Sequence, residues 1–426
     1  MISAVLFVSF FIFLIMGIPI GICLGLSSVC AILYSGTSLT IVATNMYSGI
    51  SKFLLLAIPF FVLSGNIMAK AGISKRLIRF VNTCVGHRRG GIAIVCVIVA
   101  CFFGAISGSG PATVAALGAV LIPAMIEQGG FSAPFSAALM ATASSIAIVI
   151  PPSIAFVVYA SITGVSIADM FTAGIVPGIL MGVALVIVVM IEARKNNIQS
   201  SQKRASGKER WEAFKDAFWG LLMPVIILGG IYGGIFTPTE AAVVSVFYGL
   251  VVGVFVYREI KLKDLKKIFY ESVLTMATVL LIMSASTIFG WILAKQQIPQ
   301  ALAKAFLGIS DSKYVFLLLI NVMLLVVGMV CEAGAAMVIL APLLAPIAQT
   351  LGIDLIHFGI IMMTNLAIGM MTPPVGVNLY VVCDSANVKI EGMMKYLMRY
   401  FAVLIADLLI ITYFPPLSLL IPTLLK

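Results

Sequence analysis

The chain has 426 residues, of which 62% are hydrophobic and only 10% carry a charged side chain. A soluble globular protein has about 25% charged residues, so this composition excludes a water-soluble fold and predicts an all-α polytopic membrane protein. The net charge of +10 is therefore interpreted as a topology signal, and no nucleic acid partner is expected.

Long stretches without a charged residue mark the membrane-embedded segments. Three of them run from Met1 to Ser51, from Gly90 to Ile126 and from Gln128 to Ala168. One helical span needs about 20 residues, so the second and third stretches must each be broken or folded back in the lipid bilayer. About ten to thirteen embedded segments are expected on this scale. The first stretch has no basic region before it, so we expect no cleaved signal peptide.

Two parts of the chain resemble each other at a spacing of 222 to 224 residues. Four markers recur in the same order: Gly104 with Gly328, Thr142 with Thr364, Pro151-Pro152 with Pro373-Pro374, and Asp169 with Glu391. The hydrophobic pattern predicts five membrane crossings between the two copies, an odd number, so the second copy should enter the membrane from the opposite face. Inverted repeats with broken helices are typical of secondary transporters.

The basic residues support the same topology. Of the 26 Lys and Arg residues, 21 fall in four clusters, at Lys70 to Arg89, Arg194 to Lys215, Arg258 to Lys267 and Lys389 to Arg399. The crossing count places all four clusters on one side, which the positive-inside rule makes cytoplasmic.

Each Pro-Pro pair interrupts a long apolar run near its middle. A broken helix frees backbone groups that lipid cannot satisfy, so the break is expected to face a cavity, an ion or a ligand; a simple proline kink is the alternative. Small hydroxyl and amide residues flank both breaks: Ser144, Ser145 and Ser153 in one, Thr364, Asn365, Thr372 and Asn378 in the other.

Two predicted helical hairpins carry further polar groups at their tips. The first tip, Ser107 to Pro111 with Thr113, supplies hydroxyl and carbonyl oxygens, which are hard ligands that suit Na⁺. The second tip places Glu332 among apolar residues, where it is a candidate ion ligand or proton carrier. The alternative for Glu332 is a water-exposed helix cap. Asp407 is interpreted as a buried acid with a hydrogen-bond partner.

Other chemistries lack the residues that they need. No GxxxxGK[ST] motif is present, so the chain has no P-loop with which to use ATP. His87 and His357 are the only histidines, too few for a zinc site, and no nucleophile with an assembled general base is recognisable. An enzyme is therefore not expected.

At these residues the sequence resembles the large membrane subunit of tripartite ATP-independent periplasmic (TRAP) transporters. The motifs that carry the resemblance are AIPFFVLSGNIMAKAG (57–72), GAISGSGPATVAALG (104–118), IVIPPS (148–153), GIFTPTEAA (234–242), LAPLLAPIAQTLGID (340–354), HFGIIM (357–362) and NLAIGMMTPPVGVNLYV (365–381). They extend over most of the chain, and GIFTPTEAA together with TPPVGVNLY is a specific combination.

The resemblance implies an inverted-repeat, elevator-type transporter with two re-entrant hairpins and two broken transmembrane helices. The expected parts are N-terminal scaffold helices (1–90), a first transport-domain repeat (91–170), scaffold helices with a cytoplasmic linker (171–271), a second transport-domain repeat (272–398) and a C-terminal transmembrane helix (399–426). The implied function is sodium-coupled import of an organic acid anion, of the sialic acid or C4-dicarboxylate type, across the bacterial inner membrane.

The resemblance also assigns residues to the two kinds of site. The sodium regions would comprise Ser107, Gly108, Ser109, Gly110, Ser284, Ser286, Gly328, Glu332, Asn365, Gly369, Thr372 and Gly376. The substrate would contact Ser109, Pro111, Thr113, Ser145, Ser153, Gly334, Pro373 and Asn378.

The expected partners are a small four-helix membrane subunit on a separate chain and a soluble periplasmic substrate-binding protein. Na⁺ is the expected coupling ion, without ATP. An ion channel or a non-transporting membrane scaffold is the alternative, because two hairpins that meet at the membrane midplane would also suit a pore. The sequence leaves open the identity of the anion and the sodium stoichiometry.

Overall fold

The structure is a computed structural model of the chain, and it describes residues 1–198, 202–309 and 312–425. Every regular element within these residues is helical. Eight of the described helices are long and apolar enough to cross a membrane, or up to nine if the bent pair α19 and α20 forms one span. Six further apolar helices are shorter. The predicted all-α polytopic class is therefore confirmed.

The first 34 residues form two short helices that pack against each other, α1 (Ile2–Ile15) and α2 (Ile20–Tyr34). The chain turns between them because Gly17 adopts a φ of +79°, which favours glycine, and Pro19 precedes the first turn of α2. This arrangement explains an apolar run that is long for one span and short for two.

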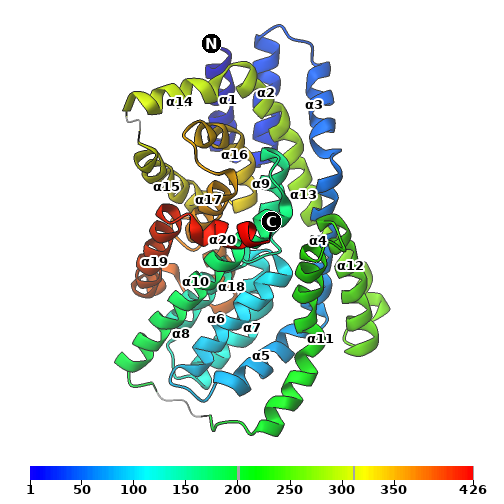
Figure 1. Cartoon of the computed structure of the whole chain (residues 1–426), viewed down its shortest axis with the longest axis vertical. Coiled ribbons are helices and arrows are strands. Elements are labelled where there is room, and N and C mark those ends of the chain that lie inside the picture. Colours follow the sequence, from blue (N-terminus) through cyan, green and yellow to red (C-terminus); the bar gives the residue numbers. More distant parts are fainter. Residues whose placement is uncertain (199–201, 310–311, 426) are drawn as a thin grey trace.

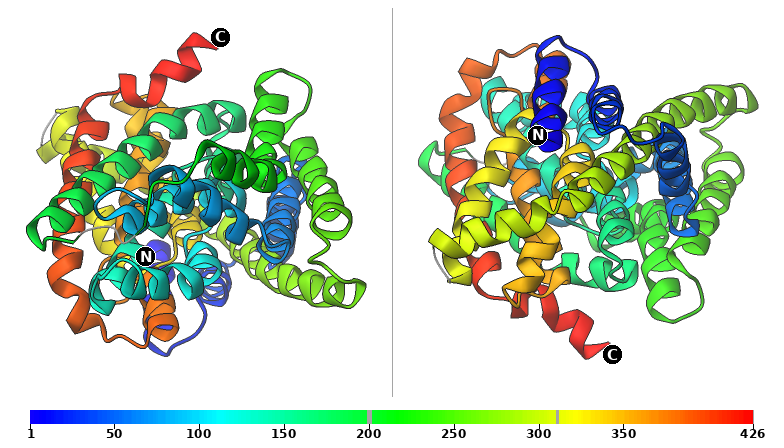
Figure 2. Two further views of the ribbon diagram at one scale, coloured as in Figure 1. Left: turned by 90° about the horizontal axis from the view of Figure 1, so that it is seen from below. Right: turned by 90° about the horizontal axis from the view of Figure 1, so that it is seen from above.

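A first set of helices, here called the lateral group, occupies one side of the molecule (Figure 1; Figure 2). Besides α1 and α2 it comprises α3 (Thr40–Ile50), the 3₁₀ turn η1 (Phe53–Leu56), α4 (Ala57–Lys70), α11 (Gly207–Tyr232), α12 (Pro238–Val251) with its π-helical extension η3 (Val252–Val256), and α13 (Leu262–Lys295). Within this group α4 packs on α12, and α13 packs on α2, α3 and α4.

The remaining long elements form two copies of one motif, here called the repeat core. The first copy contains α6 (Gly91–Ser107), α7 (Gly110–Glu127), α8 (Ala133–Ser145), the 3₁₀ turn η2 (Ile146–Ile148), α9 (Ile154–Thr163) and α10 (Ile167–Lys195). The second contains α15 (Lys313–Val330), α16 (Ala333–Thr350), α17 (Leu355–Gly369), α18 (Val377–Ala386), α19 (Ile390–Tyr413) and α20 (Pro416–Leu424). Both predicted helix breaks are thus present, at residues 149–153 and 370–376.

The two copies run in opposite directions along the long axis. In Figure 1, α6 and α7 lie in the lower half and α15 and α16 in the upper half, while α8 leads upward into α9 and α17 leads downward into α18. Each hairpin packs on the broken helix of its own copy and also on the far half of the other copy's broken helix: α7 contacts α18, and α16 contacts α9.

The repeat also survives in the closest helix contacts. Gly104 of α6 packs against Ala147 of η2, and Gly328 of α15 packs against Gly369 of α17. These are equivalent positions in the two copies, 224 and 222 residues apart. Small residues allow helix backbones to approach closely, which is how helices associate in membranes.

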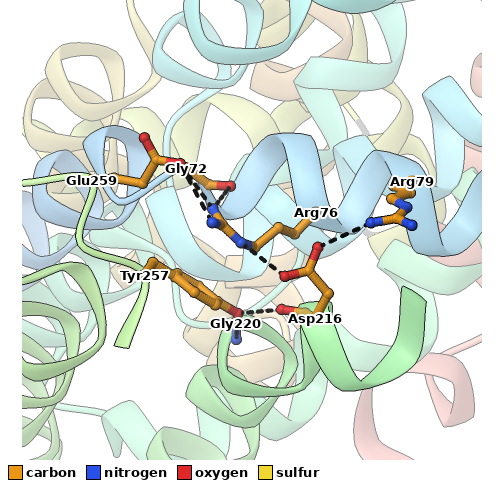
Figure 3. A network of polar contacts seen from close by, with 7 residues as sticks. All are labelled: Gly72, Arg76, Arg79, Asp216, Gly220, Tyr257 and Glu259. Carbon is orange, nitrogen blue, oxygen red and sulfur yellow. Dashed lines mark hydrogen bonds and ion pairs between the residues drawn. The ribbon is translucent and has the colours of Figure 1, made fainter. Parts of the chain in front are cut away.

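Two short helices, α5 (Ile73–Val85) and α14 (Ile298–Ile309), connect the lateral group to the two hairpins. A polar cluster fixes the first of them (Figure 3). Arg76 of α5 pairs with Asp216 at 3.1 Å and with Glu259 at 3.3 Å, and its guanidinium lies 4.0 Å from the centre of the Tyr257 ring. The hydroxyl of Tyr257 donates in turn to the carbonyl of Asp216 at 2.7 Å. The cluster therefore fastens α5 to the lateral group.

The division of the chain into five parts remains a prediction. The structure adds that α13 continues without interruption across the expected boundary at 271/272 and packs on the lateral helices. The expected parts 171–271 and 272–398 also include residues 199–201 and 310–311, which lie outside the described residues.

Candidate functional site

A cavity of about 450 Å³ lies between the repeat core and the lateral group. The core contributes both hairpin tips and residues from both helix breaks, namely Ser107 to Ala112, Ile148, Ile154, Ala155, Val158, Glu332, Gly334 and Met370. The lateral group contributes α4 and α13, through Val62, Gly65, Asn66, Thr275, Thr278, Val279 and Ile282. Seven of the predicted site residues therefore meet at one place: Ser107, Gly108, Ser109, Gly110, Pro111, Glu332 and Gly334.

Hydrogen bonds within the first hairpin hold its tip in a fixed shape. The hydroxyls of Ser107 and Thr113 lie 2.9 Å apart, and Thr113 also donates to the carbonyl of Ser109 at 2.8 Å. Gly108 adopts a φ of +60°, and a Cβ at this position would lie 3.0 Å from the carbonyl oxygen of Pro152. The tip therefore lies directly against the first helix break. Thr113 supports this tip and does not line the cavity.

The second tip lies against the second break in the same way. The backbone N–H groups of Val375 and Gly376 both donate to the carbonyl of Met329, at 3.2 and 3.0 Å. Gly376 adopts a φ of +53°, a conformation that favours glycine. The exposed carboxylate of Glu332 accepts from the N–H of Ala335 at 3.2 Å and caps α16. Glu332 is thus a helix cap that also lines the cavity.

The ends of several helices converge on the cavity and give it a mixed electrostatic character. The first turns of α7, α9 and α16 line it, and helix N-termini present free N–H groups and partial positive charge that favour an anion. The C-terminal end of α6, at Ser107 and Gly108, presents carbonyl oxygens that favour a cation. Of the described residues that line the cavity, Glu332 is the only one with an ionisable side chain.

Three buried side-chain oxygens of predicted site residues have no hydrogen-bond partner among the described residues: Ser153 Oγ, Asn365 Oδ1 and Asn378 Oδ1. All three residues are fully buried, and buried polar atoms in proteins nearly always have a partner. The Asn378 amide donates to the carbonyl of Ala141 at 3.3 Å and packs against Gly110, so the second broken helix reaches the first hairpin tip.

Other predicted residues lie away from the cavity. The Ser145 hydroxyl donates to its own helix at the carbonyl of Thr142, and Ser286 donates to the carbonyl of Met283. Ser284 faces the lateral group, where it donates to the carbonyl of Met46 at 2.9 Å.

The remaining predicted residues belong to the second break and the packing around it. Thr372 donates to the carbonyl of Ile368, Pro373 lies within the break, and Gly328 and Gly369 form a helix contact. Asp407 is buried in α19, and its Oδ2 has no hydrogen-bond partner among the described residues, so the partner expected for this acid is not found there.

Sequence reasoning missed three polar residues of the cavity lining, Asn66, Thr275 and Thr278. Asn66 donates to the Ser272 hydroxyl at 2.8 Å, which joins α4 to α13 at the cavity wall. Asn66 stands within one of the resemblant motifs, so a signal was present for it. The two threonines lie in an otherwise ordinary apolar helix and carried no signal.

The fold and the site define a polytopic membrane protein with a polar cavity enclosed by two opposed repeats. The sequence profile of the family described as "Tripartite ATP-independent periplasmic transporter, DctM component" matches residues 7–417. The chain therefore belongs to the family of large permease subunits of TRAP transporters, and it is a multi-pass protein of the bacterial inner membrane.

Individual relatives support the same family. The chain is 42% identical over 400 residues to the C4-dicarboxylate TRAP transporter large permease protein DctM of Pseudomonas aeruginosa, covering 94% of this chain and 93% of that protein. It is 39% identical over 409 residues to the sialic acid TRAP transporter large permease protein SiaM of Vibrio cholerae, covering 96% and 95%.

A longer relative and a solved structure complete the comparison. The isethionate TRAP transporter permease protein DctMQ of Oleidesulfovibrio alaskensis is 45% identical over 412 residues, which cover 96% of this chain and 65% of that protein. This chain thus spans about two thirds of that relative. The crystal structure of the YdaH transporter of Alcanivorax borkumensis has a similar fold, with a TM-score of 0.64, 15% identity and 89% coverage of both chains.

Proposed function

We propose that this chain imports an organic acid anion across the inner membrane by sodium-coupled symport, as the large subunit of a TRAP transporter. Its partners in this proposal are a small four-helix membrane subunit and a periplasmic binding protein that delivers the substrate. The single observation that carries the proposal is the cavity, because its wall is divided between the repeat core and the lateral group. A ligand enclosed in that way can be released when one group moves relative to the other.

The proposed mechanism is an elevator. The two hairpins and both broken helices pack on one another across the copies, so they form a unit that can move as one body. In the proposal this unit is the transport domain, its two hairpins are re-entrant, and the lateral group is the scaffold. The helices α5 and α14 connect the two bodies and would tilt during the movement.

The helix ends at the cavity suit an anion and a sodium ion together. The N-terminal turns of α7, α9 and α16 can bind a carboxylate or sulfonate group, which compensates for the lack of a basic side chain among the described lining residues. The carbonyl end of α6 and the unpartnered amide oxygens of Asn365 and Asn378 are hard oxygen ligands that suit Na⁺. Inverted-repeat transporters often use broken helices in this way.

Sodium coupling is energetically adequate for accumulation. Each Na⁺ gains about 2.3 kcal/mol from a membrane potential of about 100 mV. A tenfold concentration gradient adds about 1.4 kcal/mol for each ion. If two Na⁺ enter with one monovalent anion, about 5 kcal/mol remains, which supports accumulation of roughly 10³ to 10⁴-fold.

The substrate classes to test come from the relatives, whose names specify C4-dicarboxylates, sialic acid and isethionate. All three are organic acids, and none is assigned here over the others. The transport role of these relatives also supports a non-enzymatic function for this chain.

The experiment is uptake of each radiolabelled substrate into proteoliposomes that contain this chain with its small subunit and binding protein, with and without an inward sodium gradient. We expect uptake of one substrate that requires sodium. Equal uptake without the gradient would contradict sodium coupling. A large single-channel conductance in planar bilayers would instead support the alternative of a channel.

A further inference from the structure

The first arm of the second hairpin contains one isolated polar side chain. Between Phe316 and Val330 every residue of α15 is apolar except Asn321. The side chain of Asn321 is buried, with 3% of the residue exposed. A buried amide requires hydrogen-bond partners, because water and lipid are both unable to satisfy it there.

Asn321 finds its partners on two other helices of the repeat core. Its Oδ1 accepts a hydrogen bond from Asn365 Nδ2 of α17 at 2.8 Å. Its Nδ2 donates to Thr412 Oγ1 of α19 at 3.1 Å. All three residues are buried, so this short polar chain joins the hairpin arm to the second broken helix and to α19.

The bond from Asn365 also determines how the Asn365 amide is oriented. Asn365 Nδ2 makes two hydrogen bonds of 2.8 Å, one to Asn321 and one to the carbonyl of Ile361 in its own helix. Both amide hydrogens are therefore engaged, and the direction of the Oδ1 atom is fixed. This is the buried oxygen that has no partner among the described residues.

The first copy of the repeat shows that the fold itself does not need this amide pair. The positions equivalent to Asn321 and Asn365 are Val97 of α6 and Ala143 of α8, both buried and apolar. The same hairpin arm packs on the same half of the broken helix there without a side-chain hydrogen bond between these positions. The amide pair in the second copy is thus an addition to a packing arrangement that works without it.

We propose that Asn321 is a positioning residue that aims the Asn365 amide oxygen at a bound sodium ion in the second repeat. The inference rests on the proposed sodium coupling and deepens it. Asn321 does not touch the ion; it holds the ligand. Partners that orient a metal ligand typically change ion affinity by about 10 to 100-fold when they are removed.

The test compares Asn321→Val, which copies the first repeat, with the matched control Thr412→Val. The control breaks the polar chain on the far side of Asn321 and leaves the bond to Asn365 in place. For each purified variant, two quantities are measured: the thermal unfolding midpoint as sodium chloride replaces choline chloride, and the half-saturating sodium concentration for uptake by the complete complex.

For Asn321→Val we expect a half-saturating sodium concentration about tenfold or more above that of the wild type and a smaller stabilisation by sodium. The Thr412→Val variant should unfold at a lower temperature in sodium-free buffer and keep the sodium dependence of the wild type. A sodium response in Asn321→Val equal to that of the wild type would overturn the inference, as would an equal loss in both variants, because packing alone would then explain it. A wild type without any sodium response would overturn the proposed sodium coupling, and the inference with it.

Discussion

Gly369 of α17 lies so close to Gly328 of α15 that a Cβ on Gly369 would stand 2.4 Å from the Gly328 Cα atom. Real Cβ atoms essentially never approach a backbone atom this closely, so the two helices touch through their backbones. The contact lies close to the second hairpin tip and the second helix break. Any added atom must push the hairpin arm away from the broken helix.

The first prediction follows from this contact. The variant Gly369→Ala should lower the stability of the folded chain by about 1–3 kcal/mol, because an extra methyl group in a close-packed contact forces the backbone to shift. Thermal unfolding in detergent and the uptake rate would measure the effect. Gly229→Ala is the matched control, since a Cβ at this helical glycine meets nothing within 4 Å. Equal behaviour of the two variants would contradict the close contact.

A second prediction tests whether the repeat core moves against the lateral group. A Cβ on Gly290 of α13 would lie 3.9 Å from the Cβ of Pro342 of α16, within the range that a disulfide requires. After replacement of the seven native cysteines, Gly290→Cys with Pro342→Cys should form a disulfide that stops uptake. Reduction should restore uptake.

The control for this cross-link lies within the lateral group alone. A Cβ on Gly25 of α2 would lie 3.8 Å from the Cβ of Ala285 of α13. The pair Gly25→Cys with Ala285→Cys should therefore cross-link without loss of uptake. Continued uptake by the oxidised Gly290/Pro342 pair would rule out the elevator movement.

The third prediction separates two roles of Glu332. The substitution Glu332→Gln removes the charge but keeps an oxygen that can accept from the Ala335 N–H and cap α16. If the carboxylate contributes to ion binding, the half-saturating sodium concentration should rise about tenfold, equivalent to about 1.4 kcal/mol. Glu332→Ala should also lose the cap, at about 1 kcal/mol of stability. Unchanged sodium dependence in Glu332→Gln would leave Glu332 only as a cap.

The fourth prediction concerns the polar cluster on α5 (Figure 3). The Arg76 side chain is 18% exposed and contacts two carboxylates and an aromatic ring, whereas the Arg79 side chain is 63% exposed and lies 3.6 Å from Asp216. Removing Arg76 leaves a part-buried carboxylate with a weaker partner, while an exposed ion pair contributes about 0–1 kcal/mol.

Arg76→Ala should therefore speed hydrogen exchange in α5 and lower the uptake rate, and Arg79→Ala should leave both near the values of the wild type. Arg76→Lys should resemble Arg76→Ala, because lysine keeps the charge but loses the planar fork that reaches both carboxylates. Slow exchange in α5 of the Arg76→Ala variant would show that the cluster does not fasten this helix.

The sequence predicted those features that depend on local chemistry. The Pro-Pro pairs located both helix breaks, because proline removes a backbone donor wherever it occurs. The glycine-rich tip at Ser107 to Pro111 was recognisable because tight turns need glycine. These features contain their cause within a few residues.

Features that depend on long-range packing were not readable in the same way. Thr275 and Thr278 line the cavity only because α13 lies across from the hairpin tips. Ser284 carries the same hydroxyl group on the same helix, yet it faces α3, and its hydrogen bond to Met46 uses that hydroxyl inside the lateral group. A single sequence specifies which residues are polar, and the neighbouring helices decide which of them reach the cavity.

The exchange of contacts between the two copies has a consequence for biosynthesis. Helix α7 packs on α18, and the chain between residues 128 and 376 must be made before that partner exists. At about 5–20 residues per second this interval is on the order of ten to fifty seconds. Throughout it, the polar tip of the first hairpin stands in the membrane without half of its final surroundings. The newly made first half of the protein must therefore be sheltered from lipid, by the insertion machinery or by a companion subunit, until α18 arrives.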